Sequence, residues 1–261
     1  IMITTKSGKP GQTKFSYQGY VGRKDAHGSD DYRKSVADWI EFERAQTGEL
    51  SEETQYMQKI VQLTGVDRDW QDVFLEGGYI NSHSLSARGG NENTTFSGSL
   101  RYLHDEGVII TDDYKFYSGR IKVDSKVNNR VKFGVNINPS YSKQRQLPTS
   151  IHNPLRLSPW LPIYHTDATL QLINRDVYPN VGVGDYFRED HLVELDLNGD
   201  GSDTRPRTSG DSNPYQQYVE REHMEFETNL YGSTYISVDI IDGLQAKSSL
   251  ATTIEHRKRE R

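Results

Sequence analysis

The most constraining feature of this sequence is a long stretch of strict alternation between apolar and polar residues, Met224–Ile240. Alternation of this kind indicates a β-strand with one apolar face. Its 17 residues would extend about 55 Å at the usual rise per residue. Strands of soluble proteins cluster near five or six residues, whereas a strand of a membrane barrel crosses the hydrocarbon with about 9 to 11 and can project beyond it. The stretch therefore favours a membrane β-barrel.

Shorter alternating segments occur throughout the chain, and short turns connect several of them. They cover residues 13–22, 79–89, 94–104, 114–126, 131–142 and 244–257, with turns at 89–93, 127–130 and 242–243. Asparagine and glycine suit such turns because they tolerate positive φ. We expect antiparallel strands curved into a barrel wall. The predicted outward faces carry Phe15, Tyr17 and Val21; Val131, Phe133 and Val135; and Phe226, Leu230 and Ile236.

Two long connections interrupt the strands. The first contains helical patterns at Asp31–Arg44, capped by Asp30 or Asp31, and at Glu52–Leu63, with Ser51 as N-cap and Gly65 as the stop signal. The second, Ser142–Tyr218, is poorly periodic and holds most of the prolines. Its aromatic side chains need a surface to bury against, so we expect this connection to pack on a neighbour. In a membrane barrel the short turns are periplasmic and the long connections are extracellular.

The composition permits this interpretation without requiring it. Only 33% of the residues are hydrophobic, the mean hydropathy is -0.79, and no apolar run is long enough for a transmembrane helix. Taken alone, these values favour a soluble all-β protein, although barrel strands also average to low hydropathy. A net charge of -6 without a basic stripe argues against nucleic-acid binding. The absence of cysteine excludes disulfides and thiolate metal sites.

The two ends of the sequence have the character of cut points. Residue 1 is Ile1, no signal peptide opens the chain, and Thr252–Arg261 continues a strand pattern without a terminating turn. We expect this sequence to be an internal segment of a longer protein.

Several motifs, in order, resemble the SusC/RagA-like TonB-dependent transporters of Bacteroidetes. Ile1–Lys9 resembles the end of that family's plug domain, and Asp69–Phe74 resembles the stretch before its second barrel strand. His83–Phe96 is similar to the hairpin that follows, and Tyr102–Ile110 is similar to the next family motif. The resemblance covers about residues 1–142 and is weaker in the remainder, where variable loops are expected.

The resemblance implies an all-β fold: part of an antiparallel transmembrane β-barrel with long extracellular loops and a small helical insert. Residues 1–11 would end the plug domain, and residues 12–261 would form the N-terminal part of the barrel. The family resides in the outer membrane and imports large nutrients such as oligosaccharides or peptides. A SusD-like surface lipoprotein caps the barrel, and the TonB–ExbB–ExbD complex supplies energy through the plug. The alternative is a soluble glycan-binding or adhesin-like β-domain.

One segment has the opening of a calcium-binding loop. Asp196, Asn198 and Asp200 place oxygen ligands at the first, third and fifth positions, and Gly201 follows at the sixth. The twelfth position is Arg207 instead of the usual glutamate, so Asp203 or Asp211 would have to substitute. The alternative is a polar turn built from Asp, Asn and Gly.

No enzyme motif is present, and we expect no catalytic function. The eight histidines are scattered, without convincing metal-ligand spacing. The acidic pairs Glu225/Glu227 and Asp112/Asp113 could suggest a glycosidase, but lumen-facing carboxylates on barrel strands are the simpler interpretation. The three tryptophans, Trp39, Trp70 and Trp160, could stack on sugars, lie in an interfacial girdle or fill a loop core. Substrate-binding residues are not predicted.

Overall fold

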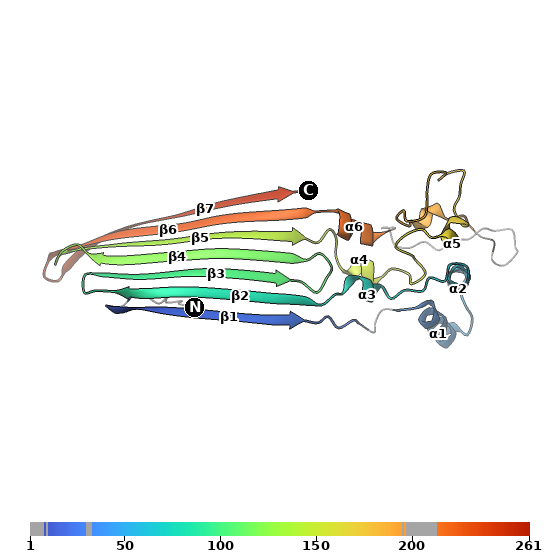
Figure 1. Ribbon diagram of the computed structural model, residues 1–261, viewed down its shortest axis with the longest axis horizontal. Helices are drawn as coiled ribbons and strands as arrows, with labels where there is room; N and C mark the ends of the chain where they lie inside the picture. The colour runs from blue at the N-terminus through green and yellow to red at the C-terminus, as the bar shows by residue number, and fades with distance from the viewer. Residues whose placement is uncertain (1–7, 9, 30–32, 195, 197–212) are drawn as a thin grey trace.

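The computed structural model describes residues 8, 10–29, 33–194, 196 and 213–261. Its strands form one seven-stranded antiparallel sheet in which each strand pairs with the next along the chain (Figure 1). The strands are β1 (Gly11–Lys24), β2 (Gly78–Gly90), β3 (Thr94–Glu106), β4 (Asp113–Lys126), β5 (Val131–Gln146), β6 (His223–Ile241) and β7 (Leu244–Glu260). This up-and-down order is the expected arrangement for part of a barrel wall. The sheet is not closed within this chain.

The strands are long, as the alternation predicted. β6 has 19 residues and β7 has 17, which corresponds to roughly 55 to 65 Å of extended chain. Each predicted strand is confirmed, and most extend one to four residues beyond the predicted ends. β5 is the clearest case because it continues to Gln146, where the sequence analysis placed an irregular connection from Ser142.

The two faces of the sheet differ in composition, and the apolar face is exposed. Cross-strand pairing aligns its large side chains from one strand to the next, as in the pair Tyr17–Leu85. The exposed residues of this face are Phe15, Tyr17, Val21, Leu85, Leu100, Tyr117, Ile121, Phe133, Ile137, Tyr141, Ile236, Leu250 and Ile254. The predicted outward faces therefore lie together. Within the described ranges there is no second sheet for them to pack on, which is the arrangement that a soluble sandwich would need.

The connections of two to four residues lie at one end of the strands, and the two long connections lie at the other together with the six-residue β3–β4 connection (Figure 1). At the β4–β5 turn the Asn128 side chain accepts hydrogen bonds from the backbone N–H groups of Arg130 and Val131, both at 2.9 Å. The β6–β7 turn contains Gly243 at φ 83°, a backbone conformation that favours glycine. Local turn chemistry thus sets the reversals at this end.

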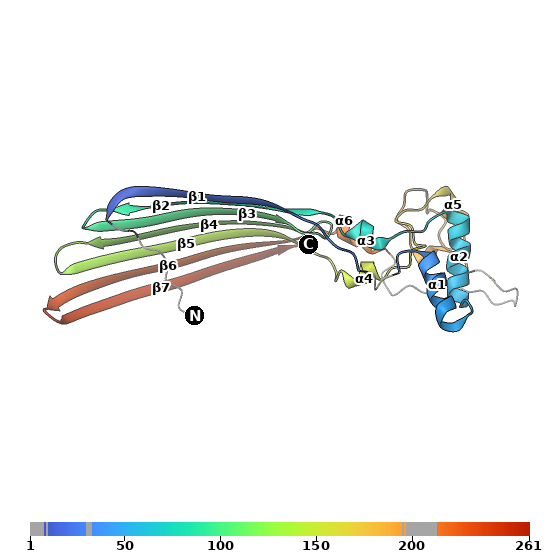
Figure 2. The same cartoon turned by 90° about the horizontal axis from the view of Figure 1, so that it is seen from below.

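The helices all belong to the long connections and lie beyond the opposite end of the sheet (Figures 1 and 2). Between β1 and β2 are α1 (Val36–Thr47), α2 (Glu52–Thr64) and α3 (Trp70–Phe74). Between β5 and β6 are α4 (His152–Leu155), α5 (Asp167–Leu170), the 3-10 helix η1 (Glu189–His191) and α6 (Pro214–Glu220). None of the helices in the described ranges combines the length and apolar composition that a membrane-spanning helix needs.

The local helix signals were predicted with mixed success. Ser51 caps α2, and Gly65 ends it at φ 70°, both as predicted. The predicted start of the first helix is wrong, because α1 begins at Val36 behind an N-cap at Ser35. Ser35 and Asp38 form a reciprocal capping box, which satisfies two backbone N–H groups at once. Asp30 and Asp31 lie outside the described residues.

Candidate functional site

The polar face of the sheet carries a network of charged and hydroxyl groups. Near the helical end, Glu225 pairs with Arg259 at 2.5 Å and with Arg257 at 3.6 Å. The side chain of Glu225 is only 12% exposed. Such ion pairs offset the cost of partly burying a carboxylate. The sequence interpretation of Glu225 and Glu227 as polar-face carboxylates is consistent with these contacts, and the structure adds their arginine partners.

A second contact on this face is possible because the strand between the two partners carries a glycine. The Tyr235 hydroxyl donates a 2.9 Å hydrogen bond to Asp124 Oδ1, two strands away. Tyr235 reaches across β5 because Gly134 is its pairing partner there, and a Cβ on Gly134 would lie 2.1 Å from the tyrosine ring. Hydrated, hydrogen-bonded side chains of this kind line the interior of transport barrels.

The opposite, apolar face carries a row of aromatic rings across five strands. The ring centroids are 5.9 Å apart for Tyr17 and His83, 6.3 Å for His83 and Tyr102, 5.2 Å for Tyr102 and Tyr117, and 6.3 Å for Tyr117 and Tyr141. Amphipathic rings collect at the boundary between hydrocarbon and water. In β2 to β5 the ring-bearing residues lie nearer the helical end of each strand than its turn end.

The two long connections fold together into one unit, which we call the loop module: the described residues of 25–77 and 147–222. Trp160, from the second connection, is fully buried and meets Tyr56 of α2 edge-on at 5.9 Å. The indole Nε1 of Trp70 donates a hydrogen bond to the backbone oxygen of Ser158 at 3.1 Å. The shared core contains Val36, Tyr56, Met57, Ile60, Trp70, Phe74, Leu157, Trp160, Leu161, Phe187, Leu192 and Tyr218. Ile110, from the β3–β4 connection, also lies in this core.

This core revises the expectation for the second connection. Trp160 buries its ring against Tyr56 of the first connection, and Phe187 packs on Trp160, whereas the sequence predicted only that this connection would pack on a neighbour. Trp70 and Trp160 are loop-core residues, which settles their role among the alternatives considered. Half-exposed Tyr164 and the exposed Val177 and Val183 remain on the module surface.

The loop module also rests on the β3–β4 connection, residues 107–112. The backbone N–H of Glu76 donates to Val108 O at 2.8 Å, and that of Ile110 donates to Phe74 O at 3.0 Å. From the other side, Arg145 Nη2 donates to the backbone oxygens of Tyr218 and Val219. The module is therefore attached to several strand ends.

A pair of buried histidines lies inside the loop module. The ring nitrogens His165 Nε2 and His191 Nδ1 are 2.8 Å apart, and His165 Nδ1 lies 3.1 Å from Thr169 Oγ1. Burial, reinforced by the neighbouring His191, lowers the pKa of His165 to about 4. Burial also lowers the pKa of His191. Both rings are thus neutral at ordinary pH and act as hydrogen-bonding parts of the core.

The predicted calcium loop falls almost entirely outside the described residues. Asp196 is described and exposed, whereas Asn198 and Asp200 are not described. Calcium binding by these three residues stays a prediction. Of the predicted plug end, residues 1–11, only residues 8, 10 and 11 are described, and Gly11 is the first residue of β1.

One cluster of potential metal ligands was missed by the sequence analysis. His104, Glu106 and Asp113 bring one ligand atom each within 4.8 Å of one another. Asp113 lies on the apolar side of the sheet with His104, so its interpretation as a lumen-facing carboxylate was wrong. The signal was present: His104 and Glu106 alternate onto one face, and the short connection to β4 returns Asp113 opposite Glu106.

Comparison with known proteins places these features in context. No family model matches the chain. It is 27% identical to TonB-dependent receptor SusC of Bacteroides thetaiotaomicron over 182 residues, which are 66% of this chain and 17% of that receptor. It is 22% identical to TonB-dependent receptor P39 of Formosa agariphila over 260 residues, 99% of this chain and 22% of the receptor. The chain thus spans about a fifth of the relatives it matches.

A solved structure shares the fold. The RagAB peptide importer in its closed-closed state superposes with a TM-score of 0.64 at 17% sequence identity. The match covers 98% of this chain and 29% of the importer chain. The superposition therefore includes both the seven-stranded sheet and the two connections that carry the helices. The chain is thus similar in sequence to SusC and a related TonB-dependent receptor, and it shares the fold of the matching part of the RagAB importer.

Proposed function

We propose that this chain forms part of the wall and mouth of an outer-membrane importer of large nutrients, oligosaccharides or peptides. The observation that carries the proposal is the sheet itself: long strands with a polar inner face and an apolar face exposed from β1 to β7. Only a hydrocarbon surrounding makes so much exposed apolar surface favourable. On this proposal residues 12–261 belong to the barrel and residues 1–11 end the plug.

The two ends of the sheet would then face different compartments. Irregular backbone must leave the hydrocarbon before it turns, and short turns face the periplasm in outer-membrane barrels. The turns at 91–93, 127–130 and 242–243 are thus assigned to the periplasm. The loop module is assigned to the cell surface, where it would meet arriving substrate.

The loop module offers a surface for a SusD-like lipoprotein. Val177 and Val183 are each 59% exposed, and Tyr164 is 41% exposed. A folded, well-packed platform holds such side chains in place, which lowers the entropic cost of docking a partner. Energy would come from the TonB–ExbB–ExbD complex acting through the plug. The structural neighbour is named as a peptide importer, so a peptide is a candidate cargo beside an oligosaccharide.

The test uses the full-length transporter produced in a Gram-negative host. We expect it in the outer-membrane fraction, with heat-modifiable migration on gels. Val177→Glu combined with Val183→Glu should reduce co-purification of the surface lipoprotein and uptake. Val127→Glu, a similarly exposed valine at the turn end, should leave both unchanged.

A detergent-free soluble monomer would contradict the proposal and favour the glycan-binding or adhesin-like domain. Equal lipoprotein capture by all variants would leave the importer in place and reject docking at Val177 and Val183.

A further inference from the structure

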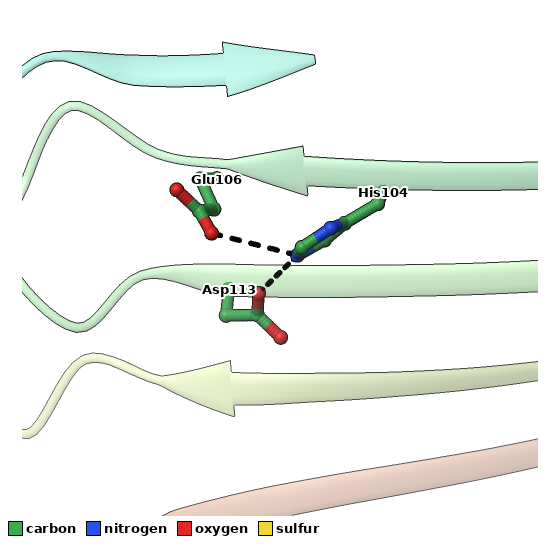
Figure 3. A group of neighbouring side chains, drawn as sticks. All are labelled: His104, Glu106 and Asp113. Atoms are coloured by element: carbon green, nitrogen blue, oxygen red, sulfur yellow. Dashed lines mark hydrogen bonds and ion pairs between the residues drawn. The ribbon is translucent and has the colours of Figure 1, made fainter. Parts of the chain in front are cut away.

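The cluster of His104, Glu106 and Asp113 lies at the helical end of the β3–β4 hairpin, on the apolar face of the sheet. Figure 3 shows the three side chains gathered together. His104 and Glu106 are two positions apart on β3, so both side chains point to the same side. Asp113 pairs directly with Glu106 across the hairpin. His104 Nε2 lies 2.5 Å from Asp113 Oδ2 and 3.8 Å from Glu106 Oε1.

These separations suit a small divalent metal ion. Zinc binds imidazole nitrogen and carboxylate oxygen at about 2.0–2.2 Å, and tetrahedral angles then set the ligand atoms roughly 3.3–3.5 Å apart. The two observed distances from His104 Nε2 lie on either side of that value. Small side-chain rotations of Asp113 and Glu106 would bring all three atoms to equal distance from one ion.

Neighbouring side chains orient the ligands in the manner of a metal site. The Tyr79 hydroxyl lies 3.2 Å from His104 Nδ1, so His104 can hydrogen-bond through Nδ1 and keep Nε2 directed at the carboxylates. Lys115 Nζ contacts the other oxygen of Asp113, Oδ1, at 3.3 Å. Metal-binding histidines and carboxylates are commonly held by such outer partners.

The surroundings of the cluster provide both enclosure and access. His104 is only 9% exposed. A cavity of about 440 Å³ opens beside the cluster, lined by Glu106, Asp113 and most residues of the 107–112 connection. Three protein ligands leave a fourth coordination position for water or another ligand, which can enter through this cavity.

We propose that His104, Glu106 and Asp113 bind a divalent transition metal of the zinc class. The imidazole ligand selects zinc, copper, nickel or iron over calcium and magnesium, which prefer oxygen ligands alone. The ion would join the end of β3 to the start of β4. It would thereby stiffen the 107–112 connection, on which the loop module rests through Glu76 and Ile110.

The competing account is a simple ion pair between His104 and Asp113 that uses no metal. It makes a different prediction, because two side chains that only pair with each other would not hold one equivalent of Zn²⁺ tightly. Metal binding is also measurable without transport, so failure here would leave the proposed importer unaffected, and failure of import would leave the metal site unaffected.

The experiment uses the purified full-length transporter in detergent, stripped with a chelator. Zn²⁺ is titrated by calorimetry, and Co²⁺ is added as a visible probe of coordination. We expect one equivalent of Zn²⁺ to bind. His104→Ala should weaken binding by at least about 100-fold, and Tyr79→Phe by about 10-fold. His83→Ala, another histidine on the same face, should bind as the parent does.

Heat-modifiable migration of each variant verifies folding, and Asp113→Asn serves if His104→Ala does not fold. Two results would overturn the proposal: no zinc binding by the parent protein, or equal affinity in the parent and in both cluster variants.

Discussion

The sheet and the loop module differ in where their apolar side chains lie: those of the sheet are exposed, and those of the module are buried. On the sheet, Leu100 is 65% exposed and Leu250 is 70% exposed. In the loop module, Trp160 is fully buried and Phe187 is 1% exposed. The module is therefore stabilised in water by its own hydrophobic core, whereas the sheet is held by interstrand hydrogen bonds and leaves its apolar face exposed. One chain thus combines a unit that has its own hydrophobic core with a sheet whose apolar face is exposed.

Truncation of the central module side chain should have the largest effect. Trp160→Ala removes edge-on contacts with Tyr56 and Phe187 and should cost about 3–5 kcal/mol. The measurement is limited proteolysis of the full-length transporter, where the module should become cleavable while the barrel keeps its heat-modifiable migration.

Phe42→Ala, on a residue that is 38% exposed, is the matched control and should change protease resistance little. Loss of barrel assembly in Trp160→Ala would show that the two regions fold as one unit.

A charge on the outward face should affect the wall and spare the loop module. Ile121 is 60% exposed and lies about four residues from Tyr117 in the aromatic row, which places it toward the bilayer midplane. Ile121→Arg should destabilise the barrel by about 2–4 kcal/mol, measured by urea unfolding in lipid vesicles.

Ser233→Arg, on the polar face, should be close to neutral in the same assay. Equal destabilisation by both substitutions would refute the assignment of the faces.

Acid should destabilise the loop module selectively. Because the pKa of His165 falls from 6.5 to about 4 on burial, the unfolded module binds more protons between these pH values. Stability is therefore fully present above pH 6.5 and is lost as the pH falls toward 4. Between about pH 6.5 and about pH 5 the module should therefore lose stability progressively.

Hydrogen exchange of module peptides at the two pH values measures this effect, and strand peptides serve as the internal reference. His165→Gln should flatten the dependence. An unchanged acid response in that variant would assign the sensitivity to another group.

Loss of one helix cap should have the smallest effect. Ser35→Ala removes half of the capping box at the start of α1 and should cost about 1 kcal/mol. Faster hydrogen exchange confined to α1 is the expected signal. The reference within the same molecule is α2, which is capped separately by Ser51. Equal acceleration in both helices would mean that the module opens only as a whole.

The strands could be predicted from the sequence because the alternation of apolar and polar residues that defines them is a local pattern. Alternation assigned Phe133, Val135 and their neighbours to one face, and the cross-strand pairing confirms it. The caps of α2 at Ser51 and Gly65 were local as well.

The module core could not be predicted in the same way. The contact between Tyr56 and Trp160 joins residues from two connections, and no periodicity in either one encodes it. The short helices α4, α5 and α6 have too few residues to show a helical period. The His104 cluster was missed for a related reason, since it requires the hairpin register as well as the residue types.

The shared core of the loop module has a consequence for engineering and for evolutionary change. Trp70 of one connection donates to Ser158 of the other, so neither connection has a complete interior without its counterpart. Exchanging only one of the two connections between related proteins would leave the core residues of the other without their packing partners. A successful graft must transfer residues 25–77 and 147–222 as a set. Insertions will be tolerated at their exposed tips before they are tolerated where the two meet.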